Sequence, residues 1–233
     1  MRIEIWSDVV CPWCLIGKRR LEAALAGFEH RDQVEVVWRS FQLDPSAPTE
    51  PTEKVALSLE RKYGGGPAGI AQMMGQVKQV AAEVGLDFTK HADALHLNTV
   101  DAHRLLHAAG ARQDDLKEAL MLAYFVEARD VADHEVLVDI ATSVGMDGDE
   151  ASAVLSSDAH RDAVEADQAQ AAAYGANGVP FFVVDSRYGV SGAQPVEVFT
   201  QLLDQAWAER SPLTMVTPGG AAPGCDDDGC ALS

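Results

Sequence analysis

The chain has few basic side chains, no long apolar run and only four cysteines. It carries 18 lysines and arginines against 36 aspartates and glutamates, which gives a formal net charge of −18. A field of that sign repels nucleic acid and anionic lipid, so we exclude both as partners. The one basic run, Lys18-Arg19-Arg20, is too short to offer a local exception. We attribute the excess of acidic residues to solubility.

Segments that direct a chain to or across a membrane are also missing. Residues 1–10 contain no basic stretch followed by an apolar one, which is the pattern of a secretory signal. No apolar run approaches the ~20 residues that a membrane-spanning helix needs. We therefore expect a cytoplasmic protein with no membrane partner. Thiols are normally kept reduced in the cytoplasm, so a disulfide there is more often catalytic than structural.

The four cysteines form two close pairs, Cys11 with Cys14 and Cys225 with Cys230. The first pair belongs to the sequence Cys11-Pro12-Trp13-Cys14, which follows a segment of strand character and begins one with helical spacing of apolar residues, about 12–28. Proline suits the first helical position, because its missing N–H would have no partner there. Cys11 then lies at the helix N-terminus, where free N–H groups and the helix dipole favour a thiolate. We predict that Cys11 has a lowered pKa and attacks, and that Cys14 is the resolving thiol.

Two other interpretations of this pair stay open, half of a zinc site and two inert core cysteines. The order of a strand, Cys-x-x-Cys and a helix favours the redox interpretation.

Strand character returns at 33–43, so the chain begins with a βαβ unit whose strands are parallel. Three prolines within 44–51 then indicate a linker. From about 52 to 157 only helical spacing is found, which predicts a helical bundle whose Met and Leu stripes form its core. After it we expect the following elements: a helix at 158–174 that ends at Gly175, strands at 181–185 and 188–192, and a last helix from Pro195.

This order predicts an α/β protein with three parts. A discontinuous domain comprises residues 1–44 and 158–211, and a helical insertion domain comprises 45–157. Residues 212–233 are rich in glycine and proline, which predicts a mobile tail that carries the second cysteine pair.

Three local sequences accompany the order of elements: Trp6-Ser7-Asp8-Val9-Val10-Cys11-Pro12-Trp13-Cys14, Asn98-Thr99-x-x-Ala102-His103-Arg104-Leu105, and Gly178-Val179-Pro180-Phe181-Phe182. With them, residues 1 to about 210 resemble the thioredoxin superfamily, and more closely its cytoplasmic DsbA-like members of the FrnE type. The resemblance implies a thioredoxin fold with a large all-helical insertion. It also implies a cis Val179–Pro180 bond beside the dithiol, which exposes the Val179 backbone to an extended substrate segment.

The activity implied by the resemblance is that of a protein dithiol–disulfide oxidoreductase or isomerase. Substrates would be protein or small-molecule disulfides and dithiols, with glutathione as a redox partner and no other cofactor or metal. Pro12-Trp13 lacks the histidine of strongly oxidising Cys-Pro-His-Cys centres, which predicts a potential nearer to isomerase or reductase values. The expected substrate-binding residues are Pro12, Trp13, Val179, Pro180, Asn98 and His103, and Glu4 is a candidate proton carrier for Cys14.

The same superfamily contains glutathione-dependent isomerases and kappa-type transferases with a similar helical insertion. The alternative function is therefore that of a glutathione-dependent isomerase or transferase acting on a small aromatic or polyketide-like compound. Those enzymes generally have serine where this chain has Cys11, and they need no second thiol. The presence of both Cys11 and Cys14 therefore argues against that branch. Asn98, Thr99 and His103 could line a small-molecule cleft in either case. For His103, a place in the core is the simpler interpretation.

Cys225 and Cys230 flank three aspartates, which raise thiol pKa values and slow attack. The pair is either a second dithiol that relays electrons to Cys11 and Cys14, or a passive disulfide or metal clip. A non-catalytic module with a four-cysteine zinc site would need the tail to dock on the first pair. Members of the resembled family are often dimers, so a homodimer is one possible assembly.

Overall fold

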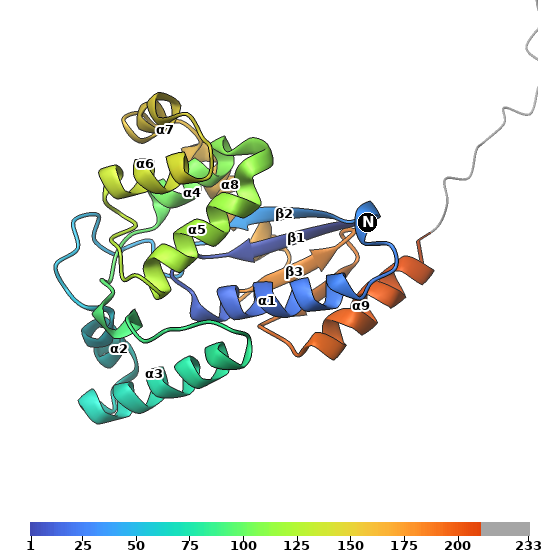
Figure 1. Ribbon diagram of the computed structural model, residues 1–233, viewed down its shortest axis with the longest axis horizontal. Coiled ribbons are helices and arrows are strands. Elements are labelled where there is room, and N and C mark those ends of the chain that lie inside the picture. Colours follow the sequence, from blue (N-terminus) through green and yellow to red (C-terminus); the bar gives the residue numbers. More distant parts are fainter. Residues whose placement is uncertain (211–233) are drawn as a thin grey trace, which may run out of the picture.

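A computed structural model describes residues 1–210, in which a four-stranded sheet has helices on both faces (Figure 1). The strand order is β2-β1-β3-β4, with β1 (Arg2–Ser7) parallel to β2 (Glu35–Ser40). β3 (Phe181–Val184) runs antiparallel to β1, and β4 (Tyr188–Ser191) antiparallel to β3. α1 (Pro12–Ala26) connects the two parallel strands, so the predicted βαβ unit is confirmed.

Successive side chains of β1 point to opposite faces of the sheet and meet different helices. Ile3 and Ile5 pack in a core with α1 and with α9 (Val196–Ala208). Trp6 faces α8 (Arg161–Ala173), and its indole N–H donates to the backbone oxygen of Asp167 at 2.7 Å. The sheet is therefore the middle of three layers.

The segment between β2 and α8 is helical, as its apolar spacing predicts, and among the described residues it holds no strand longer than an isolated bridge. Its helices are α2 (Val55–Tyr63), α3 (Gly66–Glu83), α4 (Val100–Ala108), α5 (Gln113–Phe125), α6 (His134–Ser143) and α7 (Gly148–Leu155). Short 3-10 turns lie at Arg31–Gln33, His91–Asp93 and Gly110–Arg112. No helix of residues 1–210 is both long enough and apolar enough to span a bilayer.

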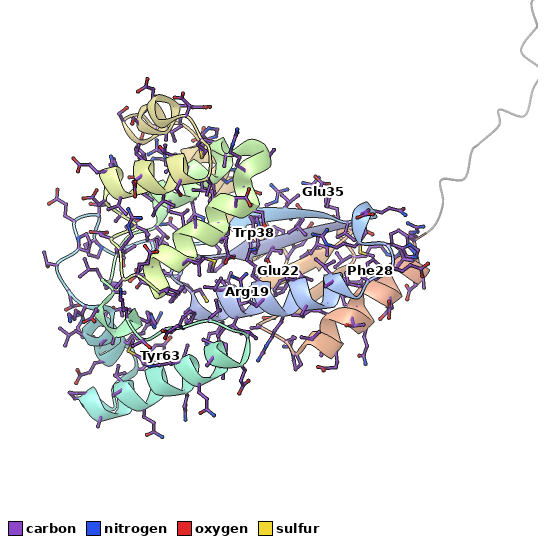
Figure 2. The ribbon with its side chains drawn as sticks, viewed as in Figure 1. Arg19, Glu22, Phe28, Glu35, Trp38 and Tyr63 are labelled. Atoms are coloured by element: carbon purple, nitrogen blue, oxygen red, sulfur yellow. The ribbon has the colours of Figure 1, made fainter. Side chains whose placement is uncertain are left out.

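The core of the helical insertion continues into the sheet domain without a break. Val9 and Leu15, which flank the cysteine pair, belong to the same buried cluster as Leu105 and Leu120 of the insertion. At the surface, Arg19 of α1 pairs with Glu22 at 2.9 Å and with Glu118 of α5 (Figure 2). The insertion is thus packed directly on the end of the sheet that carries the dithiol (Figure 1).

β2 is shorter than the strand predicted at 33–43, because its pairing with β1 runs only from Glu35 to Ser40, opposite Ser7 at the end of β1. Side chains occupy the other edge of this strand. The N–H of Trp38 donates to Gln113 at 3.0 Å, and that of Ser40 donates to the carboxylate of Asp167 at 2.8 Å. An edge covered in this way cannot pair with another chain.

Candidate active site

The cysteine pair lies at the junction of β1 and α1, where the sequence predicts it. Cys11 is the N-cap residue in an extended conformation, Pro12 is the first helical residue, and the N–H of Cys14 donates to the Cys11 oxygen at 3.0 Å. Both cysteines are free thiols, 3% and 1% exposed. The helix N-terminus supplies partial positive charge to this end of the dithiol.

Cys11 is the cysteine that a molecule from outside can reach. Its sulfur lies at the wall of a cleft of about 610 Å³, whereas Cys14 lies behind it and does not line the cleft. The Cys11 Sγ is 3.5 Å from the backbone oxygen of Val179. The Val179–Pro180 peptide bond is cis, as the resemblance implied.

A buried lysine that the sequence analysis missed lies beside the dithiol. Lys117 of α5 is fully buried, and its Nζ donates to the Ser7 oxygen at 3.1 Å and lies 5.6 Å from the centre of the Trp38 ring. Burial lowers the pKa of Lys117 to about 8, against the charges of Cys14 and Asp8, which raise it. A sequence signal for this buried lysine does exist. Lys117 has the i+3, i+4 and i+7 spacing to apolar residues of the same helix, which places it on the apolar face: Leu120, Met121 and Tyr124.

The pKa values of the two thiols run opposite to the expectation from the helix N-terminus. The hydrogen bond to Cys14, together with burial, holds the pKa of Cys11 above its ordinary value. Burial raises the pKa of Cys14 as well, but the hydrogen bond from Cys11 and the charge of Lys117 lower it overall. The helix N-terminus therefore does not set the pKa of Cys11 by itself, because the hydrogen bond with Cys14 and burial act in the opposite direction.

His103 does not line the cleft, contrary to expectation. It is completely buried, and its Nε2 lies 3.3 Å from Oδ1 of Asp8, whose other oxygen accepts the N–H of Leu43 at 2.7 Å. Burial raises the pKa of Asp8, but the hydrogen bond and charge of His103 lower it overall. Burial likewise lowers the pKa of His103 in spite of Asp8. His103 thus holds Asp8, which does line the cleft, in place.

Asn98 is also outside the cleft. Its amide nitrogen donates to the oxygens of Pro45 and Ala47, and its oxygen accepts from the N–H of Val100 and from Gln42. These bonds fix the loop after β2, a structural role that a single asparagine in the sequence does not reveal. The neighbouring Thr99 is the member of this group that reaches the cleft wall.

Glu4 has other partners than the dithiol. Its Oε1 accepts from Nε of Arg39 at 2.9 Å, within an ion-pair group that includes Asp167. The charged groups that act on the two thiols are Asp8 and Lys117.

The cleft lies between the dithiol and the helical insertion. Pro12, Trp13 and Val179 line it beside Cys11, and Pro180 is buried next to them. Trp13 is 41% exposed at the rim. The opposite wall is built from α2 and α3, including Tyr63, the last residue of α2 (Figure 2).

The apolar stripe of α3 corrects a further expectation. Four of its residues are half-buried and line the cleft, and Val77 and Val80 among them also pack against the main core: Met73, Met74, Val77 and Val80. An apolar stripe predicts a face that avoids water, and from sequence alone a core and a cleft wall are the same pattern.

Within residues 1–210 no group of three or more histidine, cysteine, aspartate or glutamate side chains is placed to hold a metal ion. Cys225 and Cys230 lie outside the described residues, so the electron relay and the four-cysteine zinc site stay untested predictions.

Several solved structures share the fold of this chain. The probable DsbA oxidoreductase SCO1869 from Streptomyces coelicolor is 46% identical, with a TM-score of 0.88 over 100% of this chain and 99% of that one. The cytosolic disulfide reductase DsbM from Pseudomonas aeruginosa, solved with GSH, is 18% identical, with a TM-score of 0.62 over 89% of this chain and 100% of that one. A 2-hydroxychromene-2-carboxylate isomerase is 14% identical, with a TM-score of 0.65 over 89% of this chain and 95% of that one, so the last two show the fold alone.

The model of the DSBA-like thioredoxin domain matches residues 2–204, nearly the whole described chain. The fold that this match implies, a thioredoxin fold with a helical insertion, is the one observed. The chain belongs to the DSBA-like thioredoxin domain family.

Proposed function

We propose that this protein is a thiol–disulfide oxidoreductase in which Cys11 exchanges with substrate and Cys14 resolves the mixed disulfide. The observation that carries the proposal is the arrangement of the two sulfurs: Cys11 lines the cleft, and Cys14 is enclosed behind it, hydrogen-bonded to Cys11. A substrate disulfide therefore meets Cys11 first, and the mixed disulfide it forms lies next to Cys14.

Lys117 supplies the charge balance for this reaction. The Lys117 ammonium lowers the pKa of Cys14 and so favours one negative charge on the hydrogen-bonded pair of sulfurs. As Cys11 attacks a substrate sulfur, its proton passes along the hydrogen bond to Cys14, and the first substrate thiolate leaves. The released substrate thiolate then takes that proton from Cys14, and Cys14 attacks the Cys11 sulfur as a thiolate beside the Lys117 ammonium, which releases the second substrate thiolate. Two electrons move from the dithiol to the substrate disulfide.

Val179 is a proposed substrate contact beside the reacting sulfur, since its backbone oxygen lies 3.5 Å from the Cys11 Sγ. Pro12 and Trp13 border the same end of the cleft and contact the substrate beside the sulfur, with Pro180 supporting Val179 from behind. The reaction takes place in the cytoplasm, which the description of DsbM as cytosolic supports. Glutathione is the redox partner to test first, because DsbM was solved with GSH.

The test is a titration of the protein in glutathione buffers, with mass mapping of the cysteine pairs at each potential. We expect a reversible Cys11–Cys14 disulfide that is absent from Cys11→Ser and from Cys14→Ser. The midpoint separates an oxidant from a reductant or isomerase. If Cys11 and Cys14 never pair at any potential, the proposal is wrong.

The second candidate is a glutathione-dependent isomerase or transferase of a small molecule. A cleft of about 610 Å³ beside Cys11 favours it, because this volume is typical of small-molecule sites. Such a reaction needs no resolving thiol, so Cys14→Ser would keep its activity, whereas an oxidoreductase would stop at the mixed disulfide.

A further inference from the structure

His91 is a polar side chain that faces the cleft without a polar partner of its own. It lies in the turn between α3 and α4, 7% exposed, with its ring 4.9 Å from the ring centre of Phe125 and 5.9 Å from that of Tyr124. It borders both the cleft and a neighbouring cavity of about 340 Å³. Burial alone lowers its pKa to about 4, and no hydrogen bond joins its ring to another described residue.

A buried imidazole without a partner is unfavourable unless water or a ligand satisfies it. Because His91 is neutral near pH 7, its ring offers one hydrogen-bond donor and one acceptor. It therefore fits an uncharged polar group on an otherwise apolar ligand.

The charges along the cleft also favour a neutral ligand. The Asp44 carboxylate lies 3.1 Å from His96 and that of Asp8 3.3 Å from His103, and both line the cleft, where they repel an anion. Lys62, exposed in the last turn of α2, is the one lysine or arginine of the described residues on this wall. An anion with two carboxylates would find one cation here, in a protein whose net charge is −18.

The other polar groups in the depth of the cleft are too few for a polypeptide. Tyr124 already donates its hydroxyl to the Leu95 oxygen at 2.9 Å, and the adjoining α3 wall consists of methionine and valine apart from Gln76. A peptide segment would bring an N–H and a C=O with every residue, and each would need a partner. Flexible methionine side chains instead adapt to apolar bodies of different shape.

We infer that the cleft binds a small, neutral disulfide with an apolar body, one polar atom of which hydrogen-bonds His91 while its sulfur reaches Cys11. This inference rests on the proposed function and names its substrate class. Cys11 attacks the substrate disulfide, Cys14 then closes the Cys11–Cys14 disulfide, and both halves leave as thiols. A thiol or dithiol reductant restores the protein. Glutathione disulfide exchanges at Cys11 from the rim, without filling the cleft.

The test compares two disulfides on the reduced full-length protein. Dipyridyl disulfide is neutral and aromatic, and oxidised glutathione is anionic. Every variant also carries Cys225→Ser and Cys230→Ser, so that Cys11 and Cys14 are the thiols that react. The measured quantity is the ratio of the second-order rate constant for dipyridyl disulfide to that for oxidised glutathione.

Val77→Glu places a carboxylate in the cleft wall, and its matched control is Gln79→Glu, an exposed position of α3 that does not line the cleft. We expect the ratio to fall about tenfold or more in Val77→Glu, because a buried charge must be desolvated by the ligand. His91→Phe, which keeps the ring shape, lowers it about three- to tenfold, the effect of one lost hydrogen bond. Gln79→Glu changes it by less than about twofold, because an exposed charge is screened.

A ratio that stays unchanged in both cleft variants overturns the inference. A third disulfide, a cystine-containing peptide, provides a second way to overturn it. If Val77→Glu lowers the rate constant for this peptide as strongly as that for dipyridyl disulfide, the cleft also receives polypeptide and the inference is wrong. If neither disulfide oxidises Cys11 and Cys14 in the wild type, the proposed function itself fails. Thermal melting of each variant shows whether a lost rate reflects unfolding.

Discussion

Lys117 places an ammonium group in the core, where burial lowers its pKa to about 8 from an ordinary 10.5. The unfolded chain therefore binds this proton more tightly than the folded one, and the burial of the charge costs stability at pH 7. The cost is full below about pH 8 and shrinks as the pH rises toward 10.5. We predict that Lys117→Met raises the free energy of unfolding by up to about 3 kcal/mol at pH 7, and by clearly less at pH 10. Urea unfolding of the reduced protein at the two pH values measures the difference from wild type.

The same substitution should slow the chemistry. Without the ammonium charge, the pKa of Cys14 rises, so less of the pair is ionised near neutral pH. We expect oxidation of the dithiol at pH 7 to slow about tenfold, with the rate profile displaced to higher pH. Lys90→Met removes an exposed lysine and is the matched control. A profile that does not move in Lys117→Met would show that Lys117 has a structural role alone.

The sequence predicts site residues well where they are neighbours in the chain. Cys11, Pro12 and Trp13 follow from one motif, and Val179 follows from a second motif through the family resemblance. Lys117 and His91 depend on how the insertion folds back over β1 and α1, contacts that span more than 70 residues. The family resemblance implies cleft positions for Asn98 and His103, but their partners, Pro45 and Asp8, turn them away from it, and His103 lies in the core, as the simpler interpretation of that residue had it.

At the scale of whole elements, α1 approaches β3 closely at one glycine. A Cβ at Gly17 would lie 3.1 Å from Cγ of Pro180 and 3.2 Å from Cζ of Phe182. Neither ring can move away easily. The Pro180 ring is bonded to its own backbone nitrogen, and the Phe182 ring packs against that of Phe199, with 4.8 Å between the ring centres. We predict that Gly17→Ala destabilises the protein by about 1–2 kcal/mol, because overpacking exceeds the gain of about 1 kcal/mol in helix propensity. Urea unfolding measures it.

Gly75 of α3 provides the control for this prediction. It has open space where a Cβ would lie, so Gly75→Ala should stabilise the protein by up to about 1 kcal/mol. Equal effects of the two substitutions would mean that the contact between α1 and β3 relaxes at no cost.

Periodicity predicts most elements, and the exceptions have physical causes. α7 follows the N-cap residue Asp147, whose carboxylate accepts the N–H groups of Asp149 and Glu150. A search for apolar spacing overlooks this cap. β2 ends at Ser40 because its partner β1 ends opposite it at Ser7, and the free edge there is covered by Asp167, which accepts the N–H of Ser40 from more than 120 residues away. The first signal is local and readable, whereas the second depends on the tertiary fold.

At the scale of the whole molecule, the α/β domain and the insertion are separate segments of the sequence, but they share one hydrophobic core. Leu15 and Ile16 of α1 lie in one cluster with Leu120 and Met121 of α5. A residue of the insertion also binds Trp38 of β2, since the Trp38 indole N–H donates to the carboxylate of Asp114 at 2.7 Å. Neither part can lose its packing without exposing apolar surface of the other.

We therefore predict that the insertion and the sheet unfold together. Amide hydrogen exchange at the centre of α5 should report the same opening free energy as exchange in β1, because both depend on the shared cluster. Exchange in α2, which has no buried residue, should be faster, since the helix can open while that cluster stays intact. A calorimetric scan of the reduced protein should likewise give one transition for the sheet and α5. Two separated transitions, with α5 exchanging freely after the first, would mean that the insertion is an independent domain and that the cleft, which lies between the two parts, is lost before the dithiol is.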